Sequence, residues 1–536
     1  MTETVAGPVP AHPPLSVAVE TIAVITIAMV GSSLSSQLVD LDIADIAGAF
    51  SISADQASWV ACAATMAEVA SIPIAALLVR ASSLRRVVLT AAVIYAACAL
   101  ASLFLPSADL LIPIRIVQSF CSGTLSVLLF VAVMASLPPG AARSVGLSVF
   151  AFASTAPIAL NATVGAFVTE TWGWEGLYYF DLFWALSLVV VGWMFLRPAP
   201  RAMGISEIDW LGYVPFALGL AALILFLKQG DRFFWLDSGI IVRAGFVAAV
   251  ALPVAVALLL WRRHPLLDVK LLITPSFGWA VTLATFYRFG LVMTAFVVPQ
   301  ALMRLHGFRL PQIAEANIAM FWAECVAFPL AWFWASRGDA RQPLSLGLVL
   351  FAAGAFASTK LTPQWQAGDF HLALVCIGLG QGLFLVPTLF YATRDVLPQQ
   401  GPTAAAFFNL SRIVGQTFGT AVLGSLITER EKFHSAVLVE SIDNASGATT
   451  QRLAALTATF QSGHSDAGLA ATQAWASLSA ALSNQAFVLA FADAFVITTA
   501  VMAVSALLVL MLPPLHSRQR PGAQEPVLPI PSGGSS

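Results

Sequence analysis

Long apolar stretches follow one another along almost the whole chain. Fourteen of them reach the roughly 20 residues that a helix needs to cross a hydrocarbon core of about 30 Å. Lipid offers unpaired backbone groups no hydrogen-bond partner, so each stretch is predicted to be an α-helix. The expected spans are residues 17–44, 57–79, 87–105, 109–136, 146–169, 176–196, 210–227, 239–262, 278–302, 312–336, 343–360, 369–393, 404–427 and 486–513. The pattern predicts an all-α membrane protein.

The composition supports this prediction. Hydrophobic residues make up 58% of the 536 residues and charged residues 10%, against about 45–50% and about 25% in soluble proteins. The mean hydropathy is +0.84. Lys and Arg total 26 and Asp and Glu total 28, so no positive excess is available to neutralise nucleic-acid phosphates. A soluble enzyme, a disordered chain and a nucleic-acid binder are excluded, and a lipid bilayer is the expected surrounding.

The distribution of Lys and Arg among the connecting segments predicts the orientation in the membrane. With both ends in the cytoplasm, the cytoplasmic segments hold fourteen of these residues and the outer segments eight. We therefore expect both termini to be cytoplasmic. The Pro-, Gly- and Ser-rich tails at residues 1–16 and 514–536 are expected to be disordered.

Two connections divide the expected helices into groups. Residues 17–196 hold six spans, residues 197–277 hold a cytoplasmic linker and two extra spans, and residues 278–513 hold the last six. The segment 428–485, within the last group, is the only long outer loop. Apolar residues at helical spacing in RLAALTATF and AWASLSAAL predict short amphipathic helices there. This loop could be a passive lid over the outer mouth or a docking surface for another protein.

Ionisable residues inside the spans are functional candidates, because each costs about 2.5–3.5 kcal/mol on insertion scales. Glu68 lies near the middle of the second span, among small residues (AATMAEVASIP). One interpretation is a buried carboxyl group without a partner, which binds a proton or a cation. The alternative is a neutral glutamic acid hydrogen-bonded to a neighbouring helix. The rarity of such residues in spans favours the first.

Two oppositely charged residues lie at matching depths on consecutive antiparallel spans. Arg288 is about 15 Å and Glu324 about 18 Å from the cytoplasmic side. We expect the two to pair, either as a structural lock between the helices or as a gate or coupling pair.

Other charged residues lie nearer the span ends. Arg115 is about 9 Å from the outer end of the fourth span. Asp40 and Asp42 lie at the outer end of the first span, where they form either a solvated rim or part of a proton path. Arg412 and Asp493 lie on consecutive spans at depths that differ by about 12 Å. Each of these two is expected to have its own partner or to face a cavity.

The sequence lacks three motifs that are typical of nucleotide-binding and hydrolytic proteins. It has no GxxxxGKS for nucleotide binding, no GxSxG and no HExxH. Its seven histidines and five cysteines show no metal-ligand spacing. We therefore predict no enzymatic activity, no cofactor and no metal, but a secondary transporter with a substrate site near the bilayer midplane.

Several stretches carry a resemblance that covers nearly the whole chain. They include ADQASWV and SIPIAALL around the second span, RIVQS at 115–119, WGWEGLYYFDLF at 172–183, SEIDWLGYV at 206–214, FNLSRIVGQTFGTAVLGSL at 408–426 and SNQAFVLAFADAF at 483–495. These stretches resemble the EmrB/QacA-type drug:proton antiporters, the fourteen-span branch of the major facilitator superfamily. They are most similar to the EmrB-like members, which work with a membrane-fusion adaptor.

Three positions depart from this family pattern. In LSSQLVDLDIA, the family's acid falls on Ser35 and Asp40 takes the place of an Asn. The aspartate expected between the second and third spans falls on Arg80, and the motif of the fifth span keeps only Gly165. The resemblance thus implies either that another carboxylate has taken over proton coupling or that coupling is altered.

The resemblance implies two six-helix bundles with two linker spans between them, and proton-driven export of multidrug or amphipathic small molecules from a bacterial inner membrane. It also implies a tripartite pump with a periplasmic adaptor and an outer-membrane channel. Expected proton-coupling residues are Glu68, Asp40, Asp42 and Arg115. Expected substrate or gating residues are Arg288, Glu324, Gln118, Asn409, Arg412, Asp493 and Phe289.

A rival hypothesis is a non-transporting or uncoupled scaffold or sensor that retains the transporter fold, and the departures from the motifs motivate it. The buried acids argue against it, because a scaffold gains nothing from a carboxyl group at the midplane.

Overall fold

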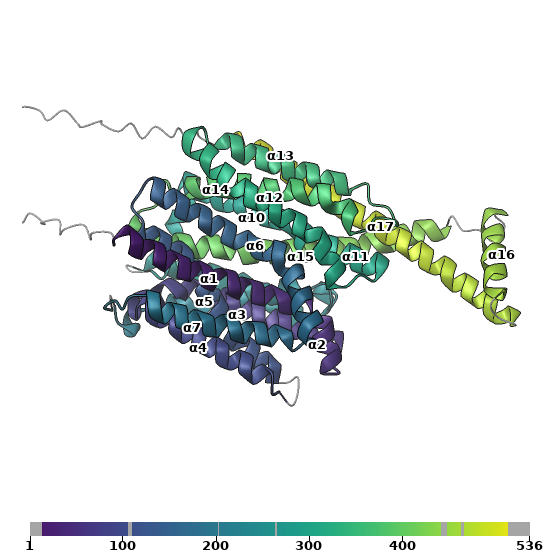
Figure 1. Ribbon diagram of the computed structural model, residues 1–536, viewed down its shortest axis with the longest axis horizontal. Helices are drawn as coiled ribbons and strands as arrows, with labels where there is room; N and C mark the ends of the chain where they lie inside the picture. Colours follow the sequence, from purple (N-terminus) through teal and green to yellow (C-terminus); the bar gives the residue numbers. More distant parts are fainter. Residues whose placement is uncertain are drawn as a thin grey trace, which may run out of the picture.

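The computed structural model describes residues 13–105, 110–201, 203–262, 265–440, 447–462 and 466–512, and these residues contain helices and connections but no β-strand (Figure 1). The expected tails lie largely outside the described residues. The α-helices are α1 (Leu15–Leu41), α2 (Ile43–Ala49), α3 (Ala54–Ala81), α4 (Leu84–Ser102), α5 (Leu111–Ser136), α6 (Ala141–Trp172), α7 (Gly176–Phe195), α8 (Trp210–Gln229), α9 (Gly239–Trp261), α10 (Pro275–Val292), α11 (Val298–His306), α12 (Leu310–Arg337), α13 (Arg341–Ser358), α14 (His371–Thr393), α15 (Gly401–Glu440), α16 (Gly447–Gln461) and α17 (Ala467–Val509).

The all-α fold class is confirmed, whereas the count of fourteen spans is not. Within the described residues, twelve helices are long and apolar enough to cross a membrane. Helices α13 and α15 lie at two further expected spans but do not meet that criterion. Helix α13 has 18 residues and begins with Arg341, and α15 carries polar residues such as Asn409 and Arg412. Polar residues lower the mean hydropathy of both.

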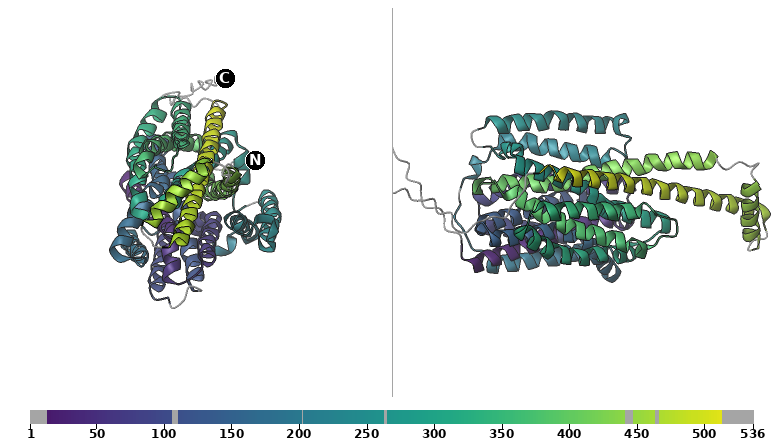
Figure 2. Two further views of the ribbon diagram at one scale, coloured as in Figure 1. Left: turned by 90° about the vertical axis from the view of Figure 1, so that its right-hand side faces the viewer. Right: turned by 90° about the horizontal axis from the view of Figure 1, so that it is seen from above.

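The helices pack into two groups that lie side by side (Figures 1 and 2). In the first, α3 and α4 pack against α5, and α1 packs against α5, α6 and α7. In the second, α14 packs against α10, α12 and α13, while α17 packs against α13 and α15. Helix α8 packs against α3 and α15, and α9 packs mainly against α8. The extra pair therefore lies beside the junction of the two groups.

The two groups meet along two contacts. We call the contact of α15 with α3 and α5 the α15 seam, and the contact of α6 with α12 and α14 the α6 seam. Near the end where α1 begins, hereafter the Leu15 end, Phe130 of α5 stacks on Phe408 of α15 with ring centres 5.9 Å apart. At the same end, the Trp332 indole of α12 donates to the Ser144 hydroxyl of α6 at 3.0 Å. Both seams are thus in side-chain contact at this end.

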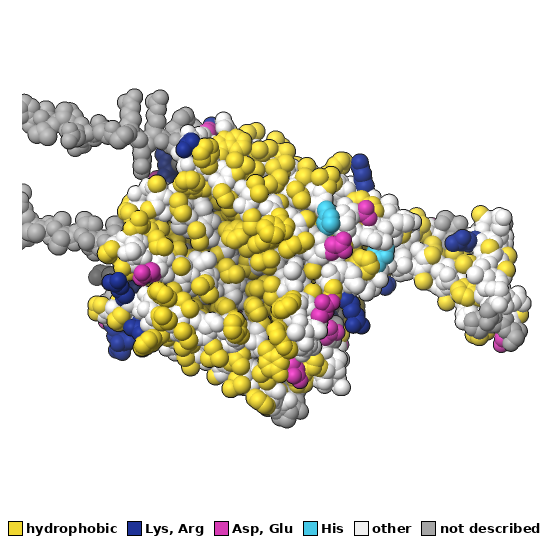
Figure 3. Space-filling view, viewed as in Figure 1, with side chains coloured by type: hydrophobic (Ala, Val, Ile, Leu, Met, Phe, Trp, Pro, Cys, Tyr) yellow, Lys and Arg dark blue, Asp and Glu magenta, His cyan; other side chains and the backbone are white. Residues whose placement is uncertain are grey.

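A broad hydrophobic surface separates two charged zones (Figure 3). Lys and Arg side chains gather near the Leu15 end, and charged residues of both signs gather near the opposite, α16 end. Many large apolar side chains of the helices are exposed, among them Phe183, Trp193, Phe246 and Trp322. Such a belt fits a hydrocarbon layer rather than water.

Two long helices extend far beyond the bundle at the α16 end. Helix α15 has 40 residues and α17 has 43, and α16 lies across their far tip (Figures 1 and 2). The expected helix at RLAALTATF is part of α16. The expectation of a separate short helix at AWASLSAAL was wrong, because this Ala- and Ser-rich stretch continues directly into α17. The segment projects away from the bundle and does not lie over it as a lid.

Candidate functional site

An ion pair joins the two helix groups at the α15 seam. Arg412 of α15 contacts Glu68 of α3, with 3.0 Å between Nη2 and Oε1, and the side chains are 12% and 10% exposed. Glu68 lies near the middle of the 28-residue α3. The sequence-based alternatives, an unpartnered acid or a neutral hydrogen-bonded acid, did not include a charged partner. The structure adds Arg412 as the charged partner of Glu68, and it confirms that Arg412 has a partner other than Asp493.

Small residues let the helices approach closely around this pair. A Cβ atom at Gly123 of α5 would lie 2.4 Å from the backbone oxygen of Glu68. A Cβ atom at Gly415 of α15 would lie 3.0 Å from the backbone oxygen of Thr285 in α10. Close backbone approach at small residues is the usual way in which membrane helices pack. The ion pair is therefore held between closely packed helices.

The α6 seam also holds an acid and a base, but they are not paired. Arg288 of α10 donates from Nη2 to the Ser154 hydroxyl at 3.1 Å, and the Thr155 hydroxyl donates to Oε2 of Glu324 at 3.3 Å. Among the described residues, the ion pairs within 4 Å do not include Arg288 with Glu324. The expected pair was therefore wrong. Instead, the hydroxyls of Ser154 and Thr155, which are neighbours on α6, form hydrogen bonds with Arg288 and Glu324, respectively.

Several buried polar atoms of the second helix group have no hydrogen-bond partner. They are Tyr287 Oη, Arg288 Nη1, Asn317 Oδ1, Glu324 Oε1, Gln381 Oε1, Asn409 Oδ1 and Arg412 Nε. Buried polar groups are rarely left unpaired in native proteins. The Tyr287 ring also stacks on Phe384, with 4.5 Å between the ring centres. This group thus offers polar and aromatic contacts to water or to a small molecule.

The acids at the end of α1 lie in different surroundings. Asp40 is 43% exposed and lies 3.4 Å from the Lys228 ammonium of α8, so it belongs to the rim. Asp42, just beyond the last residue of α1, is 4% exposed, and its Oδ2 atom has no partner. Burial, with a smaller contribution from the negative charge of Asp45, raises the pKa of Asp42 to about 7. The rim interpretation holds for Asp40 but not for Asp42.

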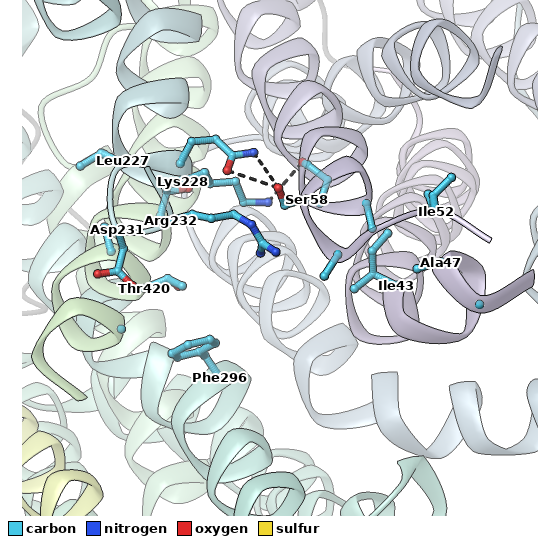
Figure 4. Close-up of a pocket in the computed structure, with 18 residues that line it drawn as sticks. Ile43, Ala47, Ile52, Ser58, Leu227, Lys228, Asp231, Arg232, Phe296 and Thr420 are labelled. Atoms are coloured by element: carbon cyan, nitrogen blue, oxygen red, sulfur yellow. Dashed lines mark hydrogen bonds between the residues drawn. The ribbon is translucent and has the colours of Figure 1, made fainter. Parts of the chain in front are cut away.

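A cavity of about 690 Å³ opens near the α16 end (Figure 4). Its walls come from α2, α3, α8 and α15 and from the π-helical turn Met293–Val297, which contributes Phe296. Lys228, Asp231 and Arg232 supply its charged groups, and most of the other lining residues are apolar. The nearest lining residues on α3 and α15, Ala61 and Thr417, lie about 8–10 Å along their helices from Glu68 and Arg412.

A second buried polar cluster lies inside the first helix group. Arg115 Nη1 donates to Gln118 Oε1 at 2.8 Å, and Gln118 Nε2 donates to Asp181 Oδ2 at 2.7 Å. Arg115 and Gln118 were predicted from the sequence, but Asp181 of α7 was not. The signal was present, because Asp181 lies inside the expected span 176–196, where any acid is a candidate.

The remaining candidates lie elsewhere. Asp493 of α17 contacts Arg430 at 2.6 Å and His434 at 2.8 Å, at the base of the projecting helices. Phe289 is 7% exposed and packs against Phe418 of α15, with 6.2 Å between ring centres. The Asn409 amide donates to the backbone oxygen of Ala405. The structure therefore brings Asp493 together with neither Arg412 nor the α6 seam.

Comparison with known proteins agrees with this architecture. The family model described as Major Facilitator Superfamily matches residues 23–287. The structure of the proton:xylose symporter XylE superposes with a TM-score of 0.58 at 12% identity, covering 94% of this chain and 97% of that one. Two helix groups with buried charges at their junction thus define a membrane transporter, and the chain belongs to the Major Facilitator Superfamily.

Relatives place it more closely within that family. The multidrug export protein EmrB of Escherichia coli K12 is 22% identical over 414 residues, covering 76% of this chain and 80% of that one. The fatty acid resistance protein FarB of Neisseria gonorrhoeae is 23% identical over 513 residues, covering 94% and 99%. The resemblance to EmrB-type exporters is confirmed, and the chain is an EmrB-like multi-pass membrane transporter.

Proposed function

We propose that the protein is a proton-coupled exporter of amphipathic small molecules in a bacterial inner membrane. The observation that carries this proposal is the Glu68–Arg412 ion pair, which links the two helix groups deep in the bundle. The Leu15 end would face the cytoplasm, in keeping with the Lys and Arg residues that gather there (Figure 3). The contacts at that end and the cavity at the other then describe an outward-open state.

The ion pair supplies a physical link between proton binding and movement of the helix groups. A buried charge that loses its partner is strongly unfavourable, so the two groups resist separation along the α15 seam while Glu68 is ionised. A proton that reaches Glu68 from the cavity neutralises it and frees Arg412 to meet water or substrate. Separation of the seam and proton uptake then occur together, which is the requirement for exchange of a proton against a substrate.

The substrate class is inferred from the polar and aromatic groups of the second helix group and from the cavity. Unpartnered polar atoms and the stacked rings of Tyr287 and Phe384 suit a molecule with both polar and apolar parts. The cavity adds apolar walls with Lys228 and Arg232. The names of the relatives EmrB and FarB, which refer to multidrug export and fatty acid resistance, fit the same class.

Proteoliposomes with an acidic interior test the coupling. Uptake of two probes, the cation ethidium and an anilinonaphthalene sulfonate, is measured for the wild type, Glu68→Gln and Asp40→Asn. We expect the wild type to accumulate at least one probe and Glu68→Gln to lose gradient-driven accumulation while keeping equilibrium exchange. Asp40→Asn should be affected less, since Asp40 lies at the exposed rim. Full accumulation by Glu68→Gln would overturn the assignment, and none by the wild type would favour the scaffold hypothesis.

We further propose that the projecting parts of α15 and α17, with α16, dock a periplasmic adaptor of a tripartite pump. Exposed apolar side chains on this projection support the proposal: Phe433, Val437, Val439, Leu469 and Trp475 are each 45–56% exposed. Residues 440–480 are replaced by a short Gly-Ser linker, and co-purification with the adaptor is measured. Loss of the adaptor is expected, whereas Lys432→Ala, at an exposed site, should retain it. Unchanged co-purification of the shortened protein would exclude docking through α16 and the part of α17 that carries Leu469 and Trp475.

A further inference from the structure

The first helix group contains a buried acid that the Glu68 mechanism does not use. Asp181 of α7 is 1% exposed, and its neighbours Gln118 and Arg115 of α5 are 1% and 2% exposed. Gln118 connects the other two, since it accepts from Arg115 and donates to Asp181. The carboxyl group and the guanidinium are thus linked through an amide and are not in direct contact.

Helices α1 and α4 both pack against α7, which carries this carboxyl group (Figure 1). Ser35 of α1 and Tyr95 of α4 are hydrogen-bonded through their hydroxyls. Ser35 also interacts with the Asp181 carboxyl group, and Tyr95 lies within electrostatic range of it. The Tyr178 hydroxyl of α7 has no hydrogen-bond partner, and it too lies within electrostatic range. Helices α1, α4, α5 and α6 contact α7. Among their described residues, the charged side chain that acts on Asp181 is Arg115.

The charges of this cluster restrict when Asp181 can take up a proton. Arg115 and Asp181 together are neutral, and both are buried. If Asp181 binds a proton while Arg115 stays in place, the buried guanidinium loses the compensating charge of this cluster, which is strongly unfavourable. Arg115 must then gain water or another acceptor, and its Nε atom already lacks a partner. Proton uptake by Asp181 therefore requires a change in the surroundings of Arg115.

We propose that Asp181 is a second proton-binding carboxyl group of the transport cycle, positioned by Gln118 and compensated by Arg115. The proposal rests on the proton-coupled export proposed above and adds one proton to it. A proton from water binds a carboxylate oxygen of Asp181 on one side of the membrane and leaves to water on the other. The geometry also indicates that a carboxyl group at position 35 would lie in the same pocket, because Ser35 faces Asp181.

The number of coupled protons sets the limiting accumulation ratio of the transported probe. Each coupled proton multiplies this ratio about tenfold per unit of pH difference, because one pH unit corresponds to about 1.4 kcal/mol. Acid-interior proteoliposomes are prepared with the wild type, Asp181→Asn, Asp181→Glu and the double variant Ser35→Asp/Asp181→Asn. The limiting ratio of the probe that the wild type transports is measured at zero membrane potential, at pH differences of one and two units.

We expect Asp181→Asn to lower the ratio about tenfold per pH unit, and both Asp181→Glu and the double variant to restore it. Recovery by a carboxyl group carried on α1 is a result that a purely structural role of Asp181 would not produce. An unchanged ratio in Asp181→Asn would overturn the proposal, as would a folded double variant that fails to recover. If Asp181→Asn does not fold, the double variant still decides the question.

The response of the wild type to the pH difference distinguishes the role proposed for Asp181 from proton-coupled export, the proposal on which it rests. A wild type that does not respond to the pH difference overturns proton-coupled export itself. A wild type that accumulates the probe, together with an Asp181→Asn variant of the same limiting ratio, overturns only the role of Asp181.

Discussion

The two seams between the helix groups hold their buried charges in opposite ways. At the α15 seam, Glu68 and Arg412 come from different groups and form a direct ion pair of 3.0 Å. At the α6 seam, Arg288 and Glu324 belong to the same group, and each is bonded across the seam to a neutral hydroxyl, Ser154 or Thr155. One seam is thus joined by charge neutralisation, and the other by two weaker hydrogen bonds.

This difference predicts how each seam responds when the two helix groups move apart. Breaking the α15 seam leaves two uncompensated charges in a dry place, unless a proton or a substrate replaces the lost partner. Breaking the α6 seam leaves each charge in its own group and costs only one hydrogen bond per charge. We therefore expect the α15 seam to be the controlled one and the α6 seam to act as the hinge.

The largest effect is expected from Arg412→Ala. This change leaves Glu68 buried without compensation and should lower the free energy of unfolding by about 3–5 kcal/mol. Glu68→Leu/Arg412→Met replaces the pair by apolar side chains and should recover most of the loss, but without gradient-driven transport. Reversible unfolding in mixed micelles measures the first effect and proteoliposome uptake the second. A double variant as unstable as Arg412→Ala would show that the pair is not what holds this seam.

A double-mutant cycle sharpens the contrast between the seams. For Glu68 and Arg412 we expect a coupling energy of about 2–3 kcal/mol. For Arg288 and Glu324 we expect one below about 1 kcal/mol, since these two residues do not form an ion pair. Each cycle compares two single apolar replacements with their combination, and unfolding in micelles gives the energies. Equal coupling energies would mean that Arg288 and Glu324 do pair and that the difference between the seams disappears.

Smaller effects are expected from the hydroxyls of α6. Ser154→Ala and Thr155→Val each remove one hydrogen bond to a charged group and should lower the free energy of unfolding by about 1–2 kcal/mol. Thr163→Val is a matched control on the same helix, because the Thr163 hydroxyl has no partner. The comparison fails if Thr155→Val and Thr163→Val prove equally stable.

The smallest effect is expected from Asp40→Asn at the rim. Asp40 and Lys228 form a pair with side chains 43% and 23% exposed, and exposed pairs contribute about 0–1 kcal/mol. This contribution should fall further at high salt, whereas that of Glu68–Arg412 should change little. Unfolding at low and high salt measures both. A salt-sensitive Glu68–Arg412 pair would mean that water reaches the α15 seam.

The depth of a charged residue could be predicted from sequence, but its partner could not. Glu68 and Arg412 were found because both interrupt apolar stretches, yet they are 344 positions apart. Their contact depends on how two separate bundles pack, and helical periodicity carries no information about that. The pairing expected for Arg288 and Glu324 assumed that adjacent helices at equal depth turn their charges toward each other, whereas both turn toward α6.

Helix continuity was a further point that periodicity missed. The Ala-rich segment before residue 486 has high helix propensity, so it extends α17 instead of forming a separate element. Asp181 was overlooked although the rule applied to Glu68 also covered it. The all-α membrane class, in contrast, followed directly from the apolar stretches, because lipid leaves the backbone few alternatives to a helix. The transporter class also needed the buried charges, the missing catalytic motifs and the family resemblance.

The uninterrupted course of α15 makes it a mechanical lever. The same helix that carries Arg412 at the junction runs on to Glu440 beyond the bundle, a distance of about 42 Å at the rise of an α-helix. A tilt of roughly 10° at the junction, modest for a rigid-body rearrangement, would sweep the far end through about 7 Å. A change in the protonation of Glu68 would thus move the far end of α15, which lies outside the membrane. A protein bound to that end would be displaced with it.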